Sequence, residues 1–335
     1  VLSPVTGYLA SFVATLSQRW NAFWYTPADP TLLGMIRILT GLMLVYTHAV
    51  WGLALHDFFG PDGWISRDLV ELVQTNQFAY SLWWLVPPSW LWPAYAAAMV
   101  ILVLFTVGLW TRITSLLSLL IVISFVNRVP EALFGLDKLN VILTFYLAIG
   151  PSGSALSLDR WLALERGASL PRAPRQSVSA AFTLRLIQVH MCIVYFFAGI
   201  SKLQGVAWWN GQAMWLAFGN LEYQSADMTW LAWHPWAVNF LTHFTALWEL
   251  SFCVLVWIPL LRPLVLIAAV ILHVAIGACL GLWTFSLIML VGCASFLPRD
   301  GVARLVTALT SRPKQRVRTK GSGRFSEEKG ARPSN

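Results

Sequence analysis

Ionisable side chains inside long apolar stretches are the first candidates for chemistry in this chain. A charge in hydrocarbon is costly, so such a side chain has a partner or a task. The candidates for catalysis among them are Lys202, Glu249, His190 and His273. A lone carboxylate such as Glu249 must be protonated or paired with a cation from another helix. It would therefore fix the register of two helices, relay a proton, or anchor the polar head group of a quinone or lipid.

Lys202 ends the apolar stretch YFFAGISKL and precedes a Trp-rich segment. One interpretation is a lysine at the outer membrane interface. The other is a base, because a partly desolvated amine can accept a proton near neutral pH. The residues themselves leave both interpretations open.

His190 and His273 are expected near the middle of their helices. Each most simply forms a hydrogen bond with a neighbouring backbone or hydroxyl group. Haem held by two facing imidazoles is a less favoured alternative, and because the chain has no attachment motif for it, we do not expect haem. These side chains also lack the i, i+4 spacing of a helical metal site, so no metal is predicted.

The helices that position these side chains follow from the composition. Of the 335 residues, 57% are hydrophobic and 11% are charged, whereas an average soluble domain has about 25% charged residues. These values exclude a soluble globular enzyme, a disordered chain and a disulfide scaffold. The apolar residues fall in runs of about 20, which is long enough to cross a bilayer. We therefore predict an all-α fold, a polytopic transmembrane helical bundle.

The bundle is expected to have about eight spans and two flanking segments. The spans are predicted over 32–55, 91–110, 113–127, 138–150, 181–203 and 238–260, and over a run from 262 to 297 that splits at Gly281 into two helices. Before them lies an N-terminal amphipathic interfacial segment over 1–30, which prolines end. The transmembrane domain covers 31–298, and a disordered basic tail follows over 299–335.

The basic residues predict how the bundle is oriented. If the spans alternate from a cytoplasmic N-terminus, 17 of the 23 lysines and arginines face the cytoplasm, in agreement with the positive-inside rule. We therefore expect both termini to be cytoplasmic and the protein to lie in a bacterial cytoplasmic membrane, surrounded by the lipid bilayer. Arg37 and Arg185, near the cytoplasmic ends of their spans, are expected to snorkel to the head groups. Because the net charge of +8 resides in the tail and a few loops, no nucleic-acid partner is predicted.

Two long outer segments, over 56–90 and 202–237, are rich in Trp and Pro. One interpretation is an aromatic belt at the level of the head groups. The other is a pair of re-entrant caps that roof a cavity, since irregular backbone at membrane depth must pack against protein or water. In the second case Trp208 and Trp209, together with His48 and His243 in the outer halves of their spans, would contact a bound quinone or lipid.

Five segments in order carry a resemblance to a known family. They are FWYTPADPTLLGMIRILTG, FFGPDGWISRDL, NRVPEALFGLDKLN, YFFAGISKLQGVAWWNG and ALWELSF. Over roughly residues 10–298 the chain resembles the HTTM family, the horizontally transferred transmembrane domains related to vitamin K-dependent gamma-glutamyl carboxylase.

The resemblance implies a function for Lys202. In the carboxylase, the lysine of the motif matching AGISKL is assigned to deprotonate vitamin K hydroquinone. Oxygen then adds, and the oxidised quinone oxyanion removes a proton from a substrate glutamate. The resemblance thus implies an intramembrane quinone or lipid pocket with Lys202 as base, Glu249 with His190 or His273 as polar support, and a vitamin K-type hydroquinone as cofactor. The carboxylase motif has two adjacent lysines, and here Ser201 stands at the first.

A second hypothesis belongs to another class of protein, and the sequence does not decide whether the chain is an enzyme. The surplus of aromatic residues, with 19 Trp and 19 Phe, also suits a non-catalytic subunit. Such a subunit would pack within a larger membrane protein complex, for example a respiratory or photosynthetic assembly.

Overall fold

The computed structural model describes residues 2–74, 80–171, 173–298, 301–304 and 308. Most of the predicted tail over 299–335 therefore lies outside the described residues. Within the described ranges every regular element is helical, and extended pairing is limited to a β-bridge between Ala28 and Ser177. The prediction of an all-α bundle is confirmed.

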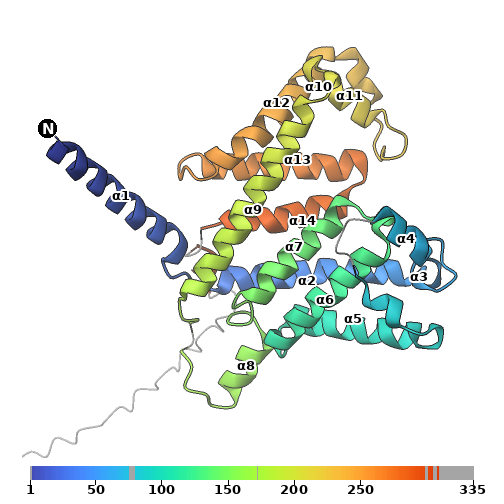
Figure 1. The fold of residues 1–335 in the computed structure, drawn as a ribbon. Coiled ribbons are helices and arrows are strands. Elements are labelled where there is room, and N and C mark those ends of the chain that lie inside the picture. Colours follow the sequence, from blue (N-terminus) through green and yellow to red (C-terminus); the bar gives the residue numbers. More distant parts are fainter. Residues whose placement is uncertain (1, 75–79, 172, 299–300, 305–307, 309–335) are drawn as a thin grey trace, which may run out of the picture.

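The long helices form one bundle (Figure 1). They are α2 (Thr31–Gly52), α5 (Leu91–Val107), α6 (Thr111–Arg128), α7 (Gly135–Ile149), α9 (Val178–Leu203), α12 (Pro235–Leu255), α13 (Arg262–Leu280) and α14 (Trp283–Cys293). Among the described residues, six helices are long and apolar enough to cross a membrane: α2, α5 with the turn before it, α6, α9, α12 and α13. Helices α7 and α14 have 15 and 11 residues. At a rise of about 1.5 Å per residue they are shorter than a bilayer core, so the count of eight spans stays a prediction.

Gly281 breaks the last apolar run, as predicted. Helix α13 ends at Leu280, and Gly281 adopts a φ of 70°, in the left-handed region. Glycine is the residue that adopts this conformation without steric cost, so it commonly ends a helix. The next helix, α14, then runs back along α13 and into the core.

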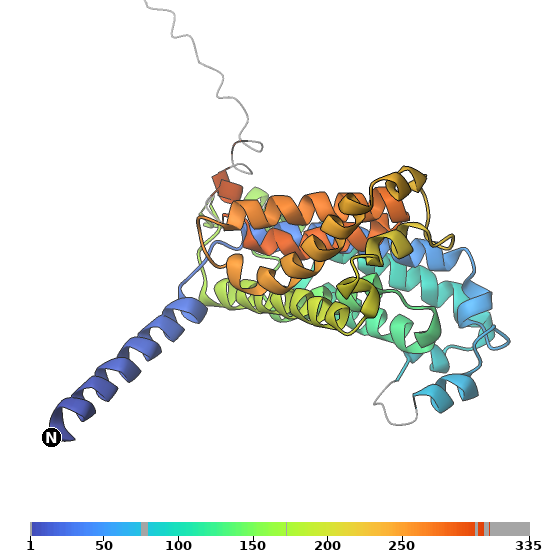
Figure 2. The same ribbon diagram turned by 90° about the horizontal axis from the view of Figure 1, so that it is seen from above.

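The bundle has two distinct ends (Figure 2). We call the end where α1 (Leu2–Tyr25) joins the bundle the α1 end; α8 (Leu158–Glu165) also belongs to it. The opposite end, the cap end, has the short helices α3 (Leu55–Phe59), α4 (Arg67–Val73), α10 (Val206–Trp209) and α11 (Ala213–Phe218).

Helix α1 projects from the bundle as an arm (Figures 1 and 2). It ends at Tyr25, just before Pro27. Its last turn packs on α9, where Trp24 and Tyr25 contact the ring of Phe182. Apolar side chains further along α1, such as Phe12, are exposed. The interfacial location of this segment stays a prediction.

Arg37 has a different environment from the predicted one. It is fully buried, with 0% exposure. Its guanidinium donates hydrogen bonds to three carbonyl oxygens of the loop that follows α7: Ser152 (2.6 Å), Leu156 (2.5 Å) and Ala155 (3.4 Å). The prediction that Arg37 snorkels is wrong, because the buried guanidinium binds these carbonyls and reaches neither head groups nor water.

Helix α8 is joined to the start of α6 at the same end. The carboxylate of Asp159 accepts hydrogen bonds from the backbone N–H groups of Trp110 (2.7 Å) and Thr111 (2.8 Å) and from the Thr111 hydroxyl (2.8 Å). It thereby satisfies N–H groups that the first turn of a helix leaves without partners. Partial burial acts to raise the pKa of Asp159, but the hydrogen bonds from Thr111 and Trp110, with the charge of Arg37, outweigh it and lower that pKa below its ordinary value.

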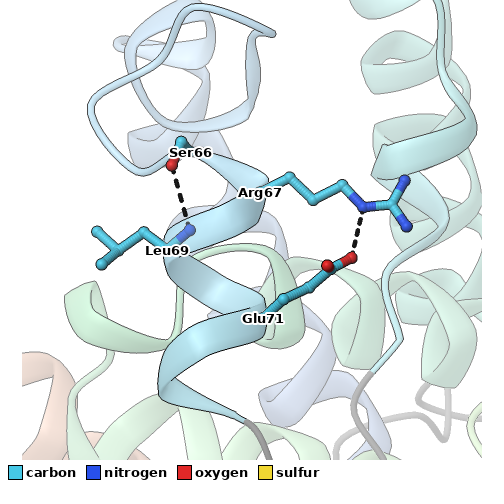
Figure 3. Close-up of polar contacts among 4 residues, drawn as sticks. All are labelled: Ser66, Arg67, Leu69 and Glu71. Carbon is cyan, nitrogen blue, oxygen red and sulfur yellow. Dashed lines mark hydrogen bonds and ion pairs between the residues drawn. The ribbon is translucent and has the colours of Figure 1, made fainter.

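The segment over 56–90, which was predicted to be an outer one, is fixed to the bundle by a buried arginine. Arg128, at the end of α6, donates hydrogen bonds to the carbonyl oxygens of Ile65 (2.7 Å) and Gly60 (3.0 Å). Trp83 of the short helix η1 (Leu82–Leu85) packs inward on Phe125 of α6. Helix α4 also has polar contacts on its surface: Ser66 caps the helix by accepting from the Leu69 N–H, and Arg67 pairs with Glu71 one turn later (Figure 3).

Candidate functional site

Lys202 and Glu249 form an ion pair between α9 and α12. The distance from Lys202 Nζ to Glu249 Oε2 is 2.6 Å. The side chains are 21% and 10% exposed, so neither charge is fully solvated. The carboxylate of Glu249 was predicted to be protonated or paired with a cation, and here it is paired with Lys202 of another helix.

Close packing of the two helices sets this register. A Cβ atom added at Gly199 would lie 2.7 Å from Leu250 Cγ, closer than real contacts allow, and 3.0 Å from Leu250 N, which is tighter than most. Gly199 precedes Lys202 by about one turn, and Leu250 follows Glu249 directly. A small residue that lets two helix backbones approach is a frequent device in membrane bundles. Here it places the last turn of α9 beside the second half of α12.

Part of the segment over 202–237 then packs beside the first half of α12. The Thr242 hydroxyl accepts a hydrogen bond from the Met214 N–H (3.2 Å) and donates to the carbonyl oxygens of Val238 (2.8 Å) and Gly211 (3.2 Å). Helices α10 and α11 therefore pack against protein along α12. The re-entrant position of this segment in a membrane stays a prediction.

Trp208 lies next to the ion pair. Lys202 Nζ is 5.2 Å from the centroid of the Trp208 ring, within the range of a cation–π contact. Trp209 has a different environment: its indole N–H donates to the carbonyl oxygen of Leu203 (2.7 Å), and its ring is exposed. Of the two tryptophans predicted to contact a ligand, the structure brings Trp208 to the pair.

His273 lies in the packed core behind α9. Its Nε2 is 2.8 Å from the hydroxyl of Tyr195, which is also 3.3 Å from Cys293 Sγ. This cluster joins α9, α13 and α14, and His273 and Tyr195 are both buried. The Tyr195 ring packs edge-on against Trp248, the neighbour of Glu249. His273 is therefore hydrogen-bonded to Tyr195 and not to Lys202 or Glu249.

His190 belongs to a different helix contact. Its Nδ1 is 3.0 Å from the hydroxyl of Tyr146 on α7. The two histidines that could have faced each other around a haem each bind a tyrosine of their own. Sequence reasoning did not single out Tyr146 or Tyr195, although a hydroxyl partner was the simpler expectation for both histidines.

His48 and His243 lie away from the ion pair. His48 is buried, its Nδ1–H donates to the carbonyl oxygen of Leu44 (2.8 Å), and its ring contacts Phe125. It lines a small cavity of about 10 Å³ between α2, α6 and α7, together with Asn140; that volume is close to one water molecule. His243 is exposed on α12 and bonds the carbonyl oxygen of Asn239 (2.9 Å). The structure does not join these histidines to Lys202 and Glu249.

The site has few side chains that could ligate a metal. Within the described part of the chain, no three His, Cys, Asp or Glu side chains cluster so that they could hold a metal ion. The cysteines at 192, 253, 279 and 293 are free. What the site offers is a lysine, a carboxylate and an aromatic ring at the cap end.

The fold and this polar pair inside apolar helices define an integral membrane protein. The model of the HTTM domain matches residues 25–300, most of the chain, and the protein therefore belongs to the HTTM family. No curated protein and no solved structure matches the chain.

Proposed function

We propose that this protein binds a quinone or quinone-like lipid at the cap end and that Lys202 acts there as a base, as in the carboxylase that the family resembles. The observation that supports the proposal best is the 2.6 Å contact between Lys202 Nζ and Glu249 Oε2 beside the face of Trp208. It joins a proton acceptor, a second acid–base group and an aromatic surface for a flat ring.

The ion pair can supply the neutral amine that a base requires. Transfer of a proton from the Lys202 ammonium to the Glu249 carboxylate gives an amine and a carboxylic acid. In apolar surroundings this neutral pair avoids the cost of holding two desolvated charges. The amine can then take a proton from a hydroquinone hydroxyl, which leaves an ammonium group and a quinol anion. Glu249 would return its own proton to solvent or ligand as the pair re-forms.

The remaining residues have supporting functions in this proposal. Trp208 would stack on the ligand ring, while Trp209 would hold the turn after Lys202 in place. His273 would keep α9, α13 and α14 in register through Tyr195. His190, His48 and His243 contact other elements, and we assign them no direct part in the proton transfer.

The test is hydroquinone oxidation by the purified protein. A reduced naphthoquinone is added in the presence of oxygen, and its loss is followed by absorbance. Lys202→Ala and Glu249→Gln are compared with Lys138→Ala, which removes the exposed lysine of α7 at the same end of the bundle. We expect Lys202→Ala to reduce the rate to the uncatalysed level and Lys138→Ala to leave it unchanged. Equal rates for the wild-type protein and Lys202→Ala would refute the catalytic proposal.

A non-catalytic subunit of a larger membrane complex is the second candidate. The exposed apolar side chains along α1, including Leu9, Phe12 and Leu16, support it, because more than half of each is left uncovered by the described chain. Purification from native membranes in a mild detergent, followed by native mass spectrometry, separates the candidates. A stable larger assembly that is lost when residues 2–25 are deleted supports the subunit, whereas a persistent monomer speaks against it.

The orientation in the membrane is part of the proposal. We propose a segment over 1–30 at the interface, a transmembrane domain over 31–298 and a tail over 299–335 on the cytoplasmic side of a bacterial cytoplasmic membrane. The gathering of lysines and arginines in alternate loops supports this orientation. A tag placed after residue 335 should be accessible from the cytoplasm alone, and external access would reverse the orientation.

A further inference from the structure

A polar cavity lies at the α1 end of the bundle, far along α9 from Lys202. Its volume is about 370 Å³, within the range of about 300–1,000 Å³ that is typical of small-molecule sites. Its walls come from four places in the chain: residues 27–29 before α2, the first turns of α9, the turn between α12 and α13, and residues 296–298 after α14. A cavity with both arginine and glutamine side chains in its walls is unusual beside apolar spans.

Two arginines, Arg185 and Arg262, supply most of the charge in this cavity. Arg185 is fixed in position: its Nε–H donates to the carbonyl oxygen of Phe23 (3.0 Å), its Nη1 to Gln188 Oε1 (2.9 Å), and its guanidinium lies over the rings of Phe23 and Trp257. The snorkelling of this arginine to the head groups stays a prediction. A guanidinium held in this way is a preorganised partner for an anion.

Arg262 approaches from the other wall. Its Nε–H donates to the carbonyl oxygen of Val256 (2.9 Å), and its Nη2 lies 3.5 Å from the carbonyl oxygen of Trp257. Arg262 therefore binds carbonyl groups just after the C-terminal end of α12. A guanidinium has five N–H donors, and these contacts occupy two of those of Arg262. The side-chain amides of Gln176 and Gln188 add further polar groups to the lining.

One carboxylate, Asp29, also lines the cavity. Its Oδ1 accepts a hydrogen bond from the Thr31 N–H (2.7 Å) at the start of α2. Two arginines against one aspartate leave the lining with a net positive charge. Such a site favours an anion with several oxygen acceptors, and the fork of arginine matches phosphate in particular.

The surroundings favour a phosphate that is attached to a lipid. Arg185, Val189, Ile193 and Phe196 are three or four residues apart, so they lie along one face of α9. Ile193 and Phe196 are 45% and 40% exposed. This apolar stripe starts beside the cavity and runs along the span, where an acyl chain would lie. Tyr25, exposed at the same end, suits the level of the head groups.

We propose that this cavity binds a phospholipid, with the phosphate between Arg185 and Arg262 and an acyl chain along the α9 stripe. The site is separate from the ion pair at the cap end and does not depend on the function proposed there. A bound lipid would join α9, the α12–α13 turn and the segment before α2 at one point.

The experiment is native mass spectrometry of the full chain in detergent, titrated with phosphatidylglycerol. Diacylglycerol with the same acyl chains tests the need for the phosphate, and inorganic phosphate tests the need for the lipid. We expect one phospholipid per chain, bound at least about tenfold more tightly than either probe, a difference of about 1.4 kcal/mol. Equal binding of diacylglycerol would overturn the phosphate site, and equal binding of inorganic phosphate would overturn the assignment to a lipid.

Variants locate the binding site. Arg262→Gln should weaken phosphatidylglycerol binding by about tenfold or more, the effect of removing a charge-assisted hydrogen bond. Because Arg262 also binds carbonyl groups just after α12, a second variant is needed: Gln176→Glu adds a negative charge at an exposed position of the lining and should weaken binding similarly without unfolding the protein. Arg166→Gln, an exposed arginine at the end of α8, is the matched control and should bind as the wild type does. Unchanged affinity in Gln176→Glu and in folded Arg262→Gln would overturn the proposal.

Discussion

The ion pair between Lys202 and Glu249 gives a quantitative prediction about stability. Replacing Glu249 by Leu removes one partner and leaves the ammonium of Lys202 in a site where its side chain is 21% exposed. Replacing Lys202 by Met leaves the carboxylate alone in the same way. The double variant has neither charge and fills the space with apolar groups of similar volume.

The expected loss of stability can be worked out from the distance between the two charges and their exposure. Two unit charges at 2.6 Å attract with about 6 kcal/mol at an effective dielectric constant of about 20. Desolvation of each ion costs several kcal/mol, so the pair as a whole contributes little net stability. Loss of one partner removes the attraction but leaves the desolvation cost of the other charge. For a fully buried pair, this lowers the free energy of unfolding by about 3–5 kcal/mol. Because Lys202 is partly exposed, we expect about 2–3 kcal/mol for Glu249→Leu.

The assay is reversible unfolding in mixed micelles, carried out on the wild type, both single variants and the double variant. We expect the double variant to be within about 1 kcal/mol of the wild type, with a coupling energy of about 2 kcal/mol or more. A close ion pair would be refuted if each single variant lost less than about 0.5 kcal/mol of unfolding free energy and the two losses summed to that of the double variant. The same preparation of Glu249→Leu should retain its helical circular dichroism, which excludes global unfolding as the cause.

Two further predictions concern the positioning of the helices. Gly199→Ala should lower the free energy of unfolding by about 1–3 kcal/mol, as in an overpacked core, because the added Cβ would crowd Leu250 of α12. It should also lower the rate of hydroquinone oxidation. Gly7→Ala, where nothing lies within 4 Å, is the control, and equal effects of the two variants would contradict the close approach of α9 and α12. The pKa of Asp159 is lowered in the folded protein, so its contribution to stability is complete above the ordinary aspartate pKa of about 4 and is lost as the pH falls through the lower folded value. Unfolding measured against pH should therefore show Asp159→Asn less stable than the wild type at pH 7 and the difference shrinking in acid; a difference independent of pH would argue against the three hydrogen bonds.

The sequence by itself determined the class of protein and most of its helices. Long apolar runs with few charges have one stable arrangement, because the backbone must satisfy its own hydrogen bonds in hydrocarbon. The break at Gly281 was also local, since it depends on the conformational freedom of that residue. Resemblance of ordered motifs was sufficient for the family, which the match over residues 25–300 confirms.

Partners of the buried polar groups were decided by the tertiary structure. The sequence required a partner for Glu249, but Lys202 became that partner because Gly199 lets α9 and α12 approach at one particular register. Arg37, expected in the head groups, instead donates hydrogen bonds to carbonyls of a loop distant in the sequence. The physical reason is the range of the forces involved: burial of apolar residues is a property of each segment, whereas a hydrogen bond or ion pair depends on atoms placed within about 3 Å by the packing of separate helices.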